Sequence, residues 1–421
     1  MLQMTRQLEK ARTYEEEAAK KIPQQERAHV HLTPYCGWMN DPNGFSFYQD
    51  KVHLFYQYAP YETVWGPMHW GHAVSADLCH WEYLPCVMAP DMDADKDGCF
   101  SGSAVTMPDG SHRLFYTGVT KAEELQVQCM AAGDGRDYEK SPSNPVIDPS
   151  MLPEGYVSRD FRDPKVWRDQ KGIYRMVVSA RNAEGDGEIL LFSSPDSEVW
   201  TFTSVLFQGE RGKRVMLECP DLFILEGTAV LIVSPMGGRS TAYLGTLDEE
   251  THEFRAETAQ QIDFGPDFYA PQTMEMPDRR RILIGWMQNW ETVGAKTRGR
   301  KTAGQMTIPR ELILQNGRLH QRPVRELFSM AKLREEKEIL VQNGHIQFTT
   351  DFTEGAVLLT MENEERQDTV LLDRFSMELF SEPTGRVSSE SFAKEQHEWM
   401  ITLPEMAAGE RVLKMKKFLI A

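Results

Sequence analysis

Three acidic residues stand close to prolines in a way that could hold carboxylates rigidly for chemistry. Asp41 directly precedes Pro42 in the stretch W-M-N-D-P-N-G at residues 38–44. Proline pushes the preceding residue into an extended conformation, and Pro-Asn-Gly closes a tight turn, so we expect this carboxylate at a rigid strand end. Arg162-Asp163-Pro164 repeats the design, and Glu218-Cys219-Pro220-Asp221 puts a third acid two residues before another proline.

These three acids are widely separated along the chain, by 163 − 41 = 122 and 218 − 163 = 55 positions. Only a fold that returns the chain repeatedly to one axis could join them. A β-propeller does so, and its innermost strands are blade edges, where a proline removes no ladder hydrogen bond. The alternative is that Asp-Pro and Asn-Gly are ordinary turn dipeptides and that Arg162-Asp163 is a salt bridge at a blade corner.

Six motifs carry a resemblance to a known family. They are W-M-N-D-P-N-G at 38–44, F-S-G-S-A at 100–104, R-D-P at 162–164, E-C-P-D at 218–221, D-F-Y-A-P-Q-T at 267–273 and M-T-I-P-R-E-L at 306–312. Each motif alone is weakly or moderately specific, but the ordered set is strong. In these motifs the chain resembles glycoside hydrolase family 32, the invertase and fructan hydrolase family.

The composition is consistent with a globular protein that acts on a neutral ligand. The chain has 421 residues, of which 41% are hydrophobic, and a net charge of −17. This length suits two domains, and the acidic balance argues against nucleic acid and anionic membrane surfaces as partners. A small sugar substrate remains the natural partner.

Residues 1–29 read as a short helical extension rather than a targeting segment. They contain no apolar run like the central part of a signal peptide, and no stretch of the chain approaches the ~20 apolar residues that span a bilayer. The six cysteines lack the density of a disulfide scaffold and the paired spacing of a zinc site. We therefore expect a cytoplasmic protein with free thiols, no metal and no cofactor.

From residue 30 to residue 314 the chain reads as many short strands separated by Gly, Pro, Asp and Asn, which predicts an all-β fold. The pattern alone does not separate a propeller from a sandwich. The resemblance implies a five-bladed β-propeller, followed over residues 315–421 by a smaller C-terminal β-sandwich-like domain. D-R-F-S-M-E at 373–378 resembles a signature of that domain, but the tail is short for the family and departs from its pattern over 381–396. A homo-oligomer formed through this domain stays open.

Cleavage of a glycosidic bond needs a proton for the leaving oxygen and an anion for the cationic sugar carbon. In line with the resemblance, we assign Asp41 as the nucleophile, Glu218 as the acid/base and Asp163 as a carboxylate that binds fructosyl hydroxyls. Carboxyls about 5–5.5 Å apart would give retention, and ~6.5–9.5 Å would give inversion. We expect Arg162 to keep Asp163 ionised and to contact hydroxyls itself.

Nine residues are predicted to bind substrate. Trp38 offers a flat apolar face for a sugar ring and Asn40 an amide for hydroxyls, while Tyr269 is expected to hydrogen-bond a catalytic carboxylate. The full set is Trp38, Asn40, Gln57, Trp65, Phe100, Ser101, Arg162, Tyr269 and Trp286. The alternative for the aromatic members is that they fill gaps between blades.

The predicted activity is that of a retaining beta-fructofuranosidase acting on sucrose or short fructo-oligosaccharides. Sucrose-6-phosphate hydrolase is one alternative, because a basic run could hold a phosphate: Lys296, Arg298, Arg300 and Lys301. A solvated loop is the favoured interpretation of that run, and G-W-M-Q-N-W at 285–290 looks more like the corresponding stretch of invertases and fructan hydrolases. A fructosyltransferase and a non-catalytic carbohydrate-binding propeller are further alternatives, the last disfavoured because all three acids are present.

Overall fold

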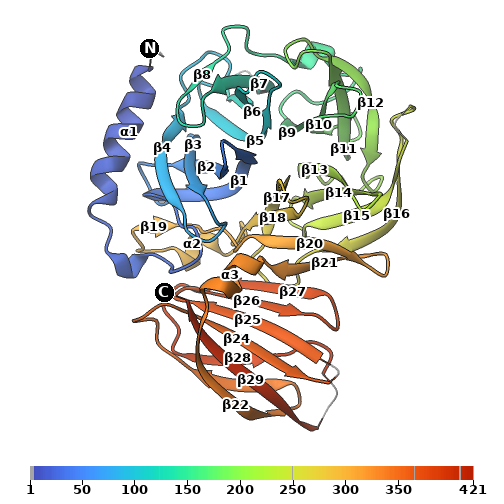
Figure 1. Cartoon of the computed structure of the whole chain (residues 1–421). Helices are drawn as coiled ribbons and strands as arrows, with labels where there is room; N and C mark the ends of the chain where they lie inside the picture. The colour runs from blue at the N-terminus through green and yellow to red at the C-terminus, as the bar shows by residue number, and fades with distance from the viewer. Residues whose placement is uncertain (1–3, 123, 249, 365, 407–408, 421) are drawn as a thin grey trace.

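The computed structural model describes residues 4–122, 124–248, 250–364, 366–406 and 409–420. A ring of β-sheets forms the upper body of the molecule, and a second β-domain lies beneath it (Figure 1). This is the predicted five-bladed propeller with a C-terminal sandwich-like domain. No helix among the described residues is long and apolar enough to cross a membrane.

Each blade is an antiparallel sheet of four consecutive strands in sequence, with one exception in the fifth. The first blade contains β1 (Gly37–Tyr48), β2 (Lys51–Ala59), β3 (His69–Ser75) and β4 (Glu82–Met88). The second contains β5 (Gly98–Thr106), β6 (His112–Thr120), β7 (Leu125–Gly133) and β8 (Tyr138–Lys140). The third contains β9 (Phe161–Arg168), β10 (Tyr174–Arg181), β11 (Gly187–Ser194) and β12 (Thr201–Gln208). The fourth contains β13 (Leu217–Leu225), β14 (Thr228–Pro235), β15 (Thr241–Leu247) and β16 (Phe254–Gln261), and the fifth contains β17 (Tyr269–Glu275), β18 (Arg281–Trp286), β20 (Arg310–Gln315) and β21 (Arg318–Pro323).

The first strands of the five blades surround the propeller axis. β1 contacts β5, β5 contacts β9, β9 and β17 contact β13, and β17 contacts β1, which closes the ring. The middle strands are buried on both faces by apolar residues, as in β10 and β14, whereas the outermost strand β16 is largely exposed. The axis is therefore the only place where the ends of all five sheets can present side chains to one point.

Four of the five innermost strands have the register shift of a β-bulge at an X-Pro step, at Asp41-Pro42, Asp163-Pro164, Cys219-Pro220 and Ala270-Pro271. A bulge re-aims the side chain at that position, and proline leaves no ladder hydrogen bond to satisfy there. In β5 the shift falls at Ser101, and at the next residue, Gly102, an added Cβ would lie 1.9 Å from the carbonyl oxygen of Phe115. The prolines next to the predicted acids therefore lie in β-bulges that turn side chains toward the axis.

The ring is completed by a late segment of the chain. The two-residue strand β19 (Thr302–Ala303) pairs in parallel with the start of β1, Gly37 with Thr302 and Trp38 with Ala303. A short helix, α2 (Val293–Lys296), precedes it. The strand that carries Asp41 is thus held on both sides.

The propeller extends further than the sequence predicted. β20 and β21 pair as a hairpin through the turn at Asn316 and Gly317, so the fifth blade runs to Pro323. The boundary expected at residue 314 falls inside this blade, because a hairpin turn had been taken for a domain junction.

The C-terminal domain follows the short helix α3 (Arg325–Met330). Its strands are β22 (Lys332–Gln342), β23 (His345–Thr349), β24 (Ala356–Asn363), β25 (Arg366–Asp373), β26 (Ser376–Ser381), β27 (Arg386–Ser391), β28 (Glu398–Thr402) and β29 (Glu410–Ile420). They are connected in the order β27-β26-β25-β24-β29-β22-β23-β28. Apolar residues of β23 and β28 pack with those of β24 and β25 in one core, so the connected sheet folds over on itself.

A fully buried charge network joins this domain to the propeller. His31 is hydrogen-bonded by Nδ1 to Asp373 at 2.9 Å and by Nε2 to Glu378 at 2.8 Å. Arg310 of β20 binds Glu378 at 2.6 Å and Asp263 at 2.9 Å. The two carboxylates raise the pKa of His31 to about 9, although burial opposes this. The D-R-F-S-M-E signature therefore supplies the acids that fasten the two domains.

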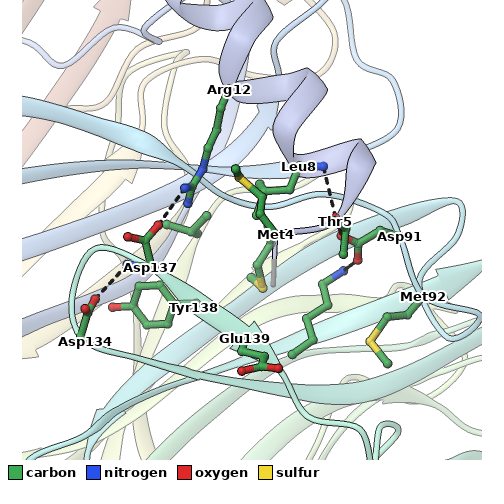
Figure 2. Close-up of a pocket in the computed structure, with 13 residues that line it drawn as sticks. Met4, Thr5, Leu8, Arg12, Asp91, Met92, Asp134, Asp137, Tyr138 and Glu139 are labelled. Carbon is green, nitrogen blue, oxygen red and sulfur yellow. Dashed lines mark hydrogen bonds and ion pairs between the residues drawn. The ribbon is translucent and has the colours of Figure 1, made fainter. Parts of the chain in front are cut away.

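The N-terminal extension is a helix, α1 (Arg6–Ala19), followed by the 3-10 turn η1 (Gln24–Glu26). α1 lies against the outside of the first two blades (Figure 1). Arg12 donates to the carbonyl oxygen of Cys86 at 2.8 Å and to Asp137 at 2.7 Å, and Thr5 donates to Asp91 (Figure 2). The helix thus ties the first blade to the second.

Candidate active site

A pocket of about 450 Å³ opens at the axis of the propeller and contains all three acids singled out in the sequence. β1 contributes Asn40 and Asp41, β5 contributes Phe100 and Ser101, and the remaining innermost strands contribute Arg162, Asp163, Glu218 and Tyr269. Every blade therefore supplies at least one pocket residue from its bulged inner strand. This arrangement brings together carboxyls that no local contact could join.

Asp41 accepts hydrogen bonds at one carboxylate oxygen and leaves the other oxygen free. The hydroxyl of Ser101 donates to Oδ2 at 2.7 Å, and the Cys219 thiol lies 3.7 Å from the same oxygen. Oδ1 has no hydrogen-bond partner among the described residues. Burial raises the pKa of Asp41, and the Ser101 hydroxyl partly offsets this. The unpartnered oxygen is suited to attack, because no donor has to be displaced first.

Glu218 is fixed through both carboxylate oxygens. Arg162 donates to Oε1 from Nε at 3.1 Å and from Nη2 at 3.0 Å, and the Tyr269 hydroxyl donates to Oε2 at 2.5 Å. Burial and the charge of Glu218 raise the pKa of Tyr269 well above its usual range, so the phenol stays a donor. Glu218 therefore has a set orientation before any substrate arrives.

Asp163 sits in the left-handed backbone region with φ of 67°, in the bulge before Pro164. Its Oδ2 accepts a hydrogen bond from the backbone N–H of Cys219 at 3.0 Å, and its own N–H donates to Thr117 at 2.9 Å. Burial raises the pKa of Asp163 to about 7, and the nearby Glu218 charge adds to this.

Arg162 binds Glu218 more closely than Asp163, which differs from the role predicted for it from the sequence. It lies 4.0 Å from Asp163 but 3.0 Å from Glu218 and 3.2 Å from Asp160. Although its charge lowers the pKa of Asp163, burial outweighs it and the net shift is upward. The arginine therefore orients the proposed acid/base rather than keeping Asp163 ionised.

The predicted substrate-binding residues divide into two groups. Those that line the pocket are Asn40, Gln57, Trp65, Phe100, Ser101, Arg162 and Tyr269. Trp38 and Trp286 are buried and do not belong to the lining; they pack behind Trp290, with Trp38 stacked on it at 6.1 Å between ring centroids. Trp38 donates to Asn40 at 2.7 Å. These two tryptophans support the wall instead of forming it.

The sequence reading missed several lining residues: Gln126, Arg159, Asp160, Met236, Gly237 and Trp290. Gln126 accepts from Arg162 at 3.2 Å and from the backbone N–H of Phe161 at 2.9 Å. Trp290 packs in front of Trp38 and Trp286, and its own side chain is 45% exposed. Three of them, Arg159, Asp160 and Trp290, had a signal nearby, since each lies within four residues of a singled-out residue.

A second pocket, of about 470 Å³, lies between α1 and the first two blades (Figure 2). Its two cations are already paired: Lys140 lies 2.6 Å from both Asp91 and Asp95, and Arg12 binds Asp137. A substrate anion would have to displace one of these carboxylates, which is costly for partly buried pairs. This pocket therefore reads as a packing gap beside the helix.

Comparison with known proteins agrees with the site. The family model described as "Glycosyl hydrolases family 32 N-terminal domain" matches residues 31–323. The sucrose-6-phosphate hydrolase of Escherichia coli is 41% identical over 327 residues, which cover 72% of this chain and 65% of that protein. The chain thus spans less than two thirds of this relative. The sucrose-6-phosphate hydrolase of Bacillus subtilis strain 168 is 36% identical over 406 residues, 90% of this chain and 81% of that protein.

A solved structure extends the likeness to the whole described fold. The GH32 beta-fructofuranosidase of Bombyx mori superimposes with a TM-score of 0.80 at 30% identity, covering 98% of this chain and 97% of that chain. A mutant of the same enzyme, solved in complex with sucrose, gives the same TM-score at 29% identity and covers 99% and 98%. From its motifs, its pocket and these matches, this chain belongs to glycoside hydrolase family 32.

Proposed function

We propose that this protein is a retaining beta-fructofuranosidase that hydrolyses terminal non-reducing β-D-fructofuranosyl residues of sucrose and short fructo-oligosaccharides. The observation that carries the proposal is the convergence of Asp41, Asp163 and Glu218 in one axial pocket. Neutral hydrogen-bonding side chains and aromatic faces line the same pocket, which suits an uncharged sugar.

In the first step, Oδ1 of Asp41 attacks the anomeric carbon of the fructosyl unit. The bond from that carbon to the leaving oxygen breaks, and Glu218 transfers its proton to the leaving oxygen. The products of this step are a covalent fructosyl-Asp41 ester, an ionised Glu218 and a free glucose unit. Arg162 and Tyr269 stabilise the anion that forms on Glu218, because both donate to its oxygens.

In the second step, water takes the place of the leaving sugar. Glu218 accepts a proton from the water as its oxygen attacks the anomeric carbon, and the ester bond to Asp41 breaks. Asp41 is released as a carboxylate, with the Ser101 hydroxyl still donating to its Oδ2, and fructose leaves. Asp163, fixed by the Cys219 N–H, binds fructosyl hydroxyls and stabilises the positive charge that develops on the ring.

Three measurements test this proposal. Purified protein should release fructose from sucrose and from short fructo-oligosaccharides, with the β-anomer formed first by NMR. Asp41→Asn should lose nearly all activity, about 10²-fold or more, while keeping its thermal stability. An Asp41→Asn protein that splits sucrose at the parental rate would refute it. Longer oligomers accumulating at high sucrose would point to a fructosyltransferase instead.

Sucrose 6-phosphate is the second candidate substrate, favoured by two cations at the pocket mouth. Arg159 lines the pocket, where it forms an exposed ion pair with Glu124 at 3.4 Å, and Lys121 lies over the Trp65 ring at 5.5 Å. Several relatives are sucrose-6-phosphate hydrolases by name. The basic run considered as an alternative phosphate site lies outside the pocket lining, and in it Lys296 pairs with Asp267 and Arg300 with Glu26.

Arg159→Gln separates the two substrates. If the phosphorylated sugar is natural, this change should raise the KM for sucrose 6-phosphate about tenfold and leave the KM for sucrose nearly unchanged, because one charged hydrogen bond is lost. Arg298→Gln is the matched control, since Arg298 is exposed and outside the lining. Equal turnover of both sugars by the parent would favour plain sucrose.

We also place the protein in the cytoplasm. All six cysteines are free thiols, which suits a reducing compartment. Fractionation of the native host, with the activity followed in each fraction, tests this placement.

A further inference from the structure

The C-terminal domain has a long strand with one open side. β22 pairs along its length with β29, from Lys332 with Leu419 to Gln342 with Glu410. On its other side only Gln342 is paired, with His345 at the hairpin, after which β23 turns away to pair with β28. Lys332 to Val341 therefore has no strand neighbour on that side among the described residues.

The direction of the backbone groups along this side follows from the hairpin. Asn343 and Gly344 both have positive φ, as a two-residue turn requires, so Gln342 and His345 exchange backbone hydrogen bonds across it. Asn343 points the other way and donates to the carbonyl oxygen of Gly409 at 2.8 Å. Since the direction alternates along a strand, Leu340, Glu338 and Glu336 present their N–H and C=O groups to the open side.

The side chains of β22 are exposed as well. Every residue from Lys332 to Glu338 is exposed, and Leu333 and Leu340 are 53% and 51% exposed. A long, exposed strand edge is a template for pairing with another chain, and monomeric proteins generally cover or shorten it. This edge is neither covered nor short.

The charges at the centre of β22 favour pairing with a second, antiparallel copy. With the two-fold axis at Glu336, Glu335 lies opposite the partner's Lys337, and symmetry repeats this pair, while Glu336 lies opposite the partner's Glu336. Two opposite-charge pairs therefore flank one like-charge pair, and the bulge between Leu333 and Glu335 ends the regular register on that side. A register centred on Lys337 would instead oppose like charges. Opposite charges across an antiparallel pair stabilise it, and like charges destabilise it.

We propose that β22 is the dimer interface of this protein, pairing with the β22 strand of a second copy in the antiparallel register centred on Glu336. The two C-terminal sheets then form one continuous sheet across the two-fold axis. The interface is isologous and closes on itself, so it gives a dimer rather than a filament.

Sedimentation equilibrium of the full chain at micromolar concentration tests the interface. Wild type should have twice the monomer mass. Lys337→Glu places glutamates opposite each other twice and should weaken the dimer about tenfold or more. The swap Glu335→Lys/Lys337→Glu restores the pairing with the signs reversed, and should return the Kd to within about threefold of wild type. It also restores the contact within the strand, where Glu335 and Lys337 lie 2.9 Å apart.

A backbone variant tests the edge independently of charge. Glu338→Pro removes an N–H that points to the open side and leaves the β29 ladder intact, so the protein should fold and be monomeric. Lys171→Glu, at an exposed position between β9 and β10, makes the same change in net charge as Lys337→Glu and should remain a dimer. Thermal melting of each variant checks that the domain is folded.

Three results would overturn the proposal. They are a monomeric wild type, a Glu338→Pro protein that is folded and still a dimer, and a charge swap that fails to restore a dimer lost in Lys337→Glu. Sucrose hydrolysis is measured separately, so loss of the dimer is distinguishable from failure of the proposed activity.

Discussion

The pocket carboxyls differ mainly in the donors that face them. Glu218 receives three hydrogen bonds from Arg162 and Tyr269. Asp41 receives one from the Ser101 hydroxyl and Asp163 one from the backbone N–H of Cys219, and the Cys219 thiol makes a weaker contact of 3.7 Å with each. Donors stabilise a carboxylate and so help a carboxyl to give up its proton, whereas a carboxylate oxygen without a donor is the better nucleophile. The roles that we propose for Glu218 and Asp41 fit these hydrogen bonds.

The acid/base role of Glu218 predicts a dependence on the leaving group. Glu218→Gln should lower sucrose hydrolysis by about 10²–10⁴-fold, because the leaving oxygen then departs without a proton. A fructoside with an activated leaving group needs no such proton and should keep a much larger share of its rate. Parallel assays of the two substrates measure this. Equal losses for both would contradict the role.

The buried carboxyl of Asp163 should lower the stability of the native protein, although we propose that it binds the substrate. Its pKa of about 7 lies above the ordinary value, so the unfolded chain gives up this proton at lower pH than the native protein does. The native state therefore loses stability as pH rises from about 4 to about 7. Asp163→Asn should raise the free energy of unfolding at pH 8 by about 1–3 kcal/mol while abolishing activity. Denaturant unfolding at pH 8 and at pH 4, where the difference should vanish, measures it.

At the scale of elements, the innermost strands are the part of the fold that could best be predicted from the sequence. The X-Pro steps mark bulges, so a local signal located Asp41, Asp163 and Tyr269, and the E-C-P-D motif located Glu218. Gln126 and Met236 carry no such mark. They lie on strand β7 and in the segment after β14, and only the ring of blades brings them to the axis.

The two errors of the sequence reading have the same origin. Asn316 and Gly317 form a turn that is the same whether it ends a domain or joins two strands of one blade, so the boundary was placed too early. Trp38 and Trp286 were predicted to line the pocket because they are aromatic. Their burial behind Trp290 depends on tertiary packing, which the residue types alone do not reveal.

The helix α1 should stabilise the first two blades. Arg12→Ala removes the hydrogen bond to the Cys86 carbonyl and the ion pair with Asp137, and should lower the free energy of unfolding by about 1–3 kcal/mol. Thermal or denaturant unfolding measures this. Gln7→Ala, at an exposed position of the same helix, is the matched control and should change little. An equal loss in both variants would show that the helix acts only through its general packing.

At the scale of the whole molecule, the domains are joined through Arg310. Arg310→Met leaves Glu378 and Asp263 buried without their cation, which should cost about 3–5 kcal/mol of unfolding free energy. Differential scanning calorimetry should then separate the C-terminal transition from that of the propeller. The control variant Arg318→Met, at an exposed position of β21, should unfold in a single transition at the wild-type temperature.

Buried neutral histidines set the acid limit of the fold. Burial lowers the pKa of His53 and His69 to about 4, that of His112 to about 3, and that of His72 well below its usual range. Below pH 6.5 the unfolded chain binds protons that the native protein does not, so stability should fall steadily as pH drops from about 6.5 toward 4.

Replacing one of these histidines should flatten that acid slope. His72→Phe removes one of the titrating groups, and its ring already stacks on Phe55 at 4.1 Å. Melting temperatures between pH 7 and pH 4.5 measure the slope. His345→Gln, at an exposed position of β23, should leave it unchanged.

The parallel pairing of β19 with β1 has a consequence for biosynthesis. The strand β1 is made early and can pair at once with β2, but the partner of its first two residues is 302 − 37 = 265 residues further along the chain. A nascent chain on the ribosome therefore leaves Gly37 and Trp38 without this partner until residues 302–303 have emerged, and contacts so distant in sequence form slowly. Truncated translation products that stop before this point should be captured by chaperones or degraded.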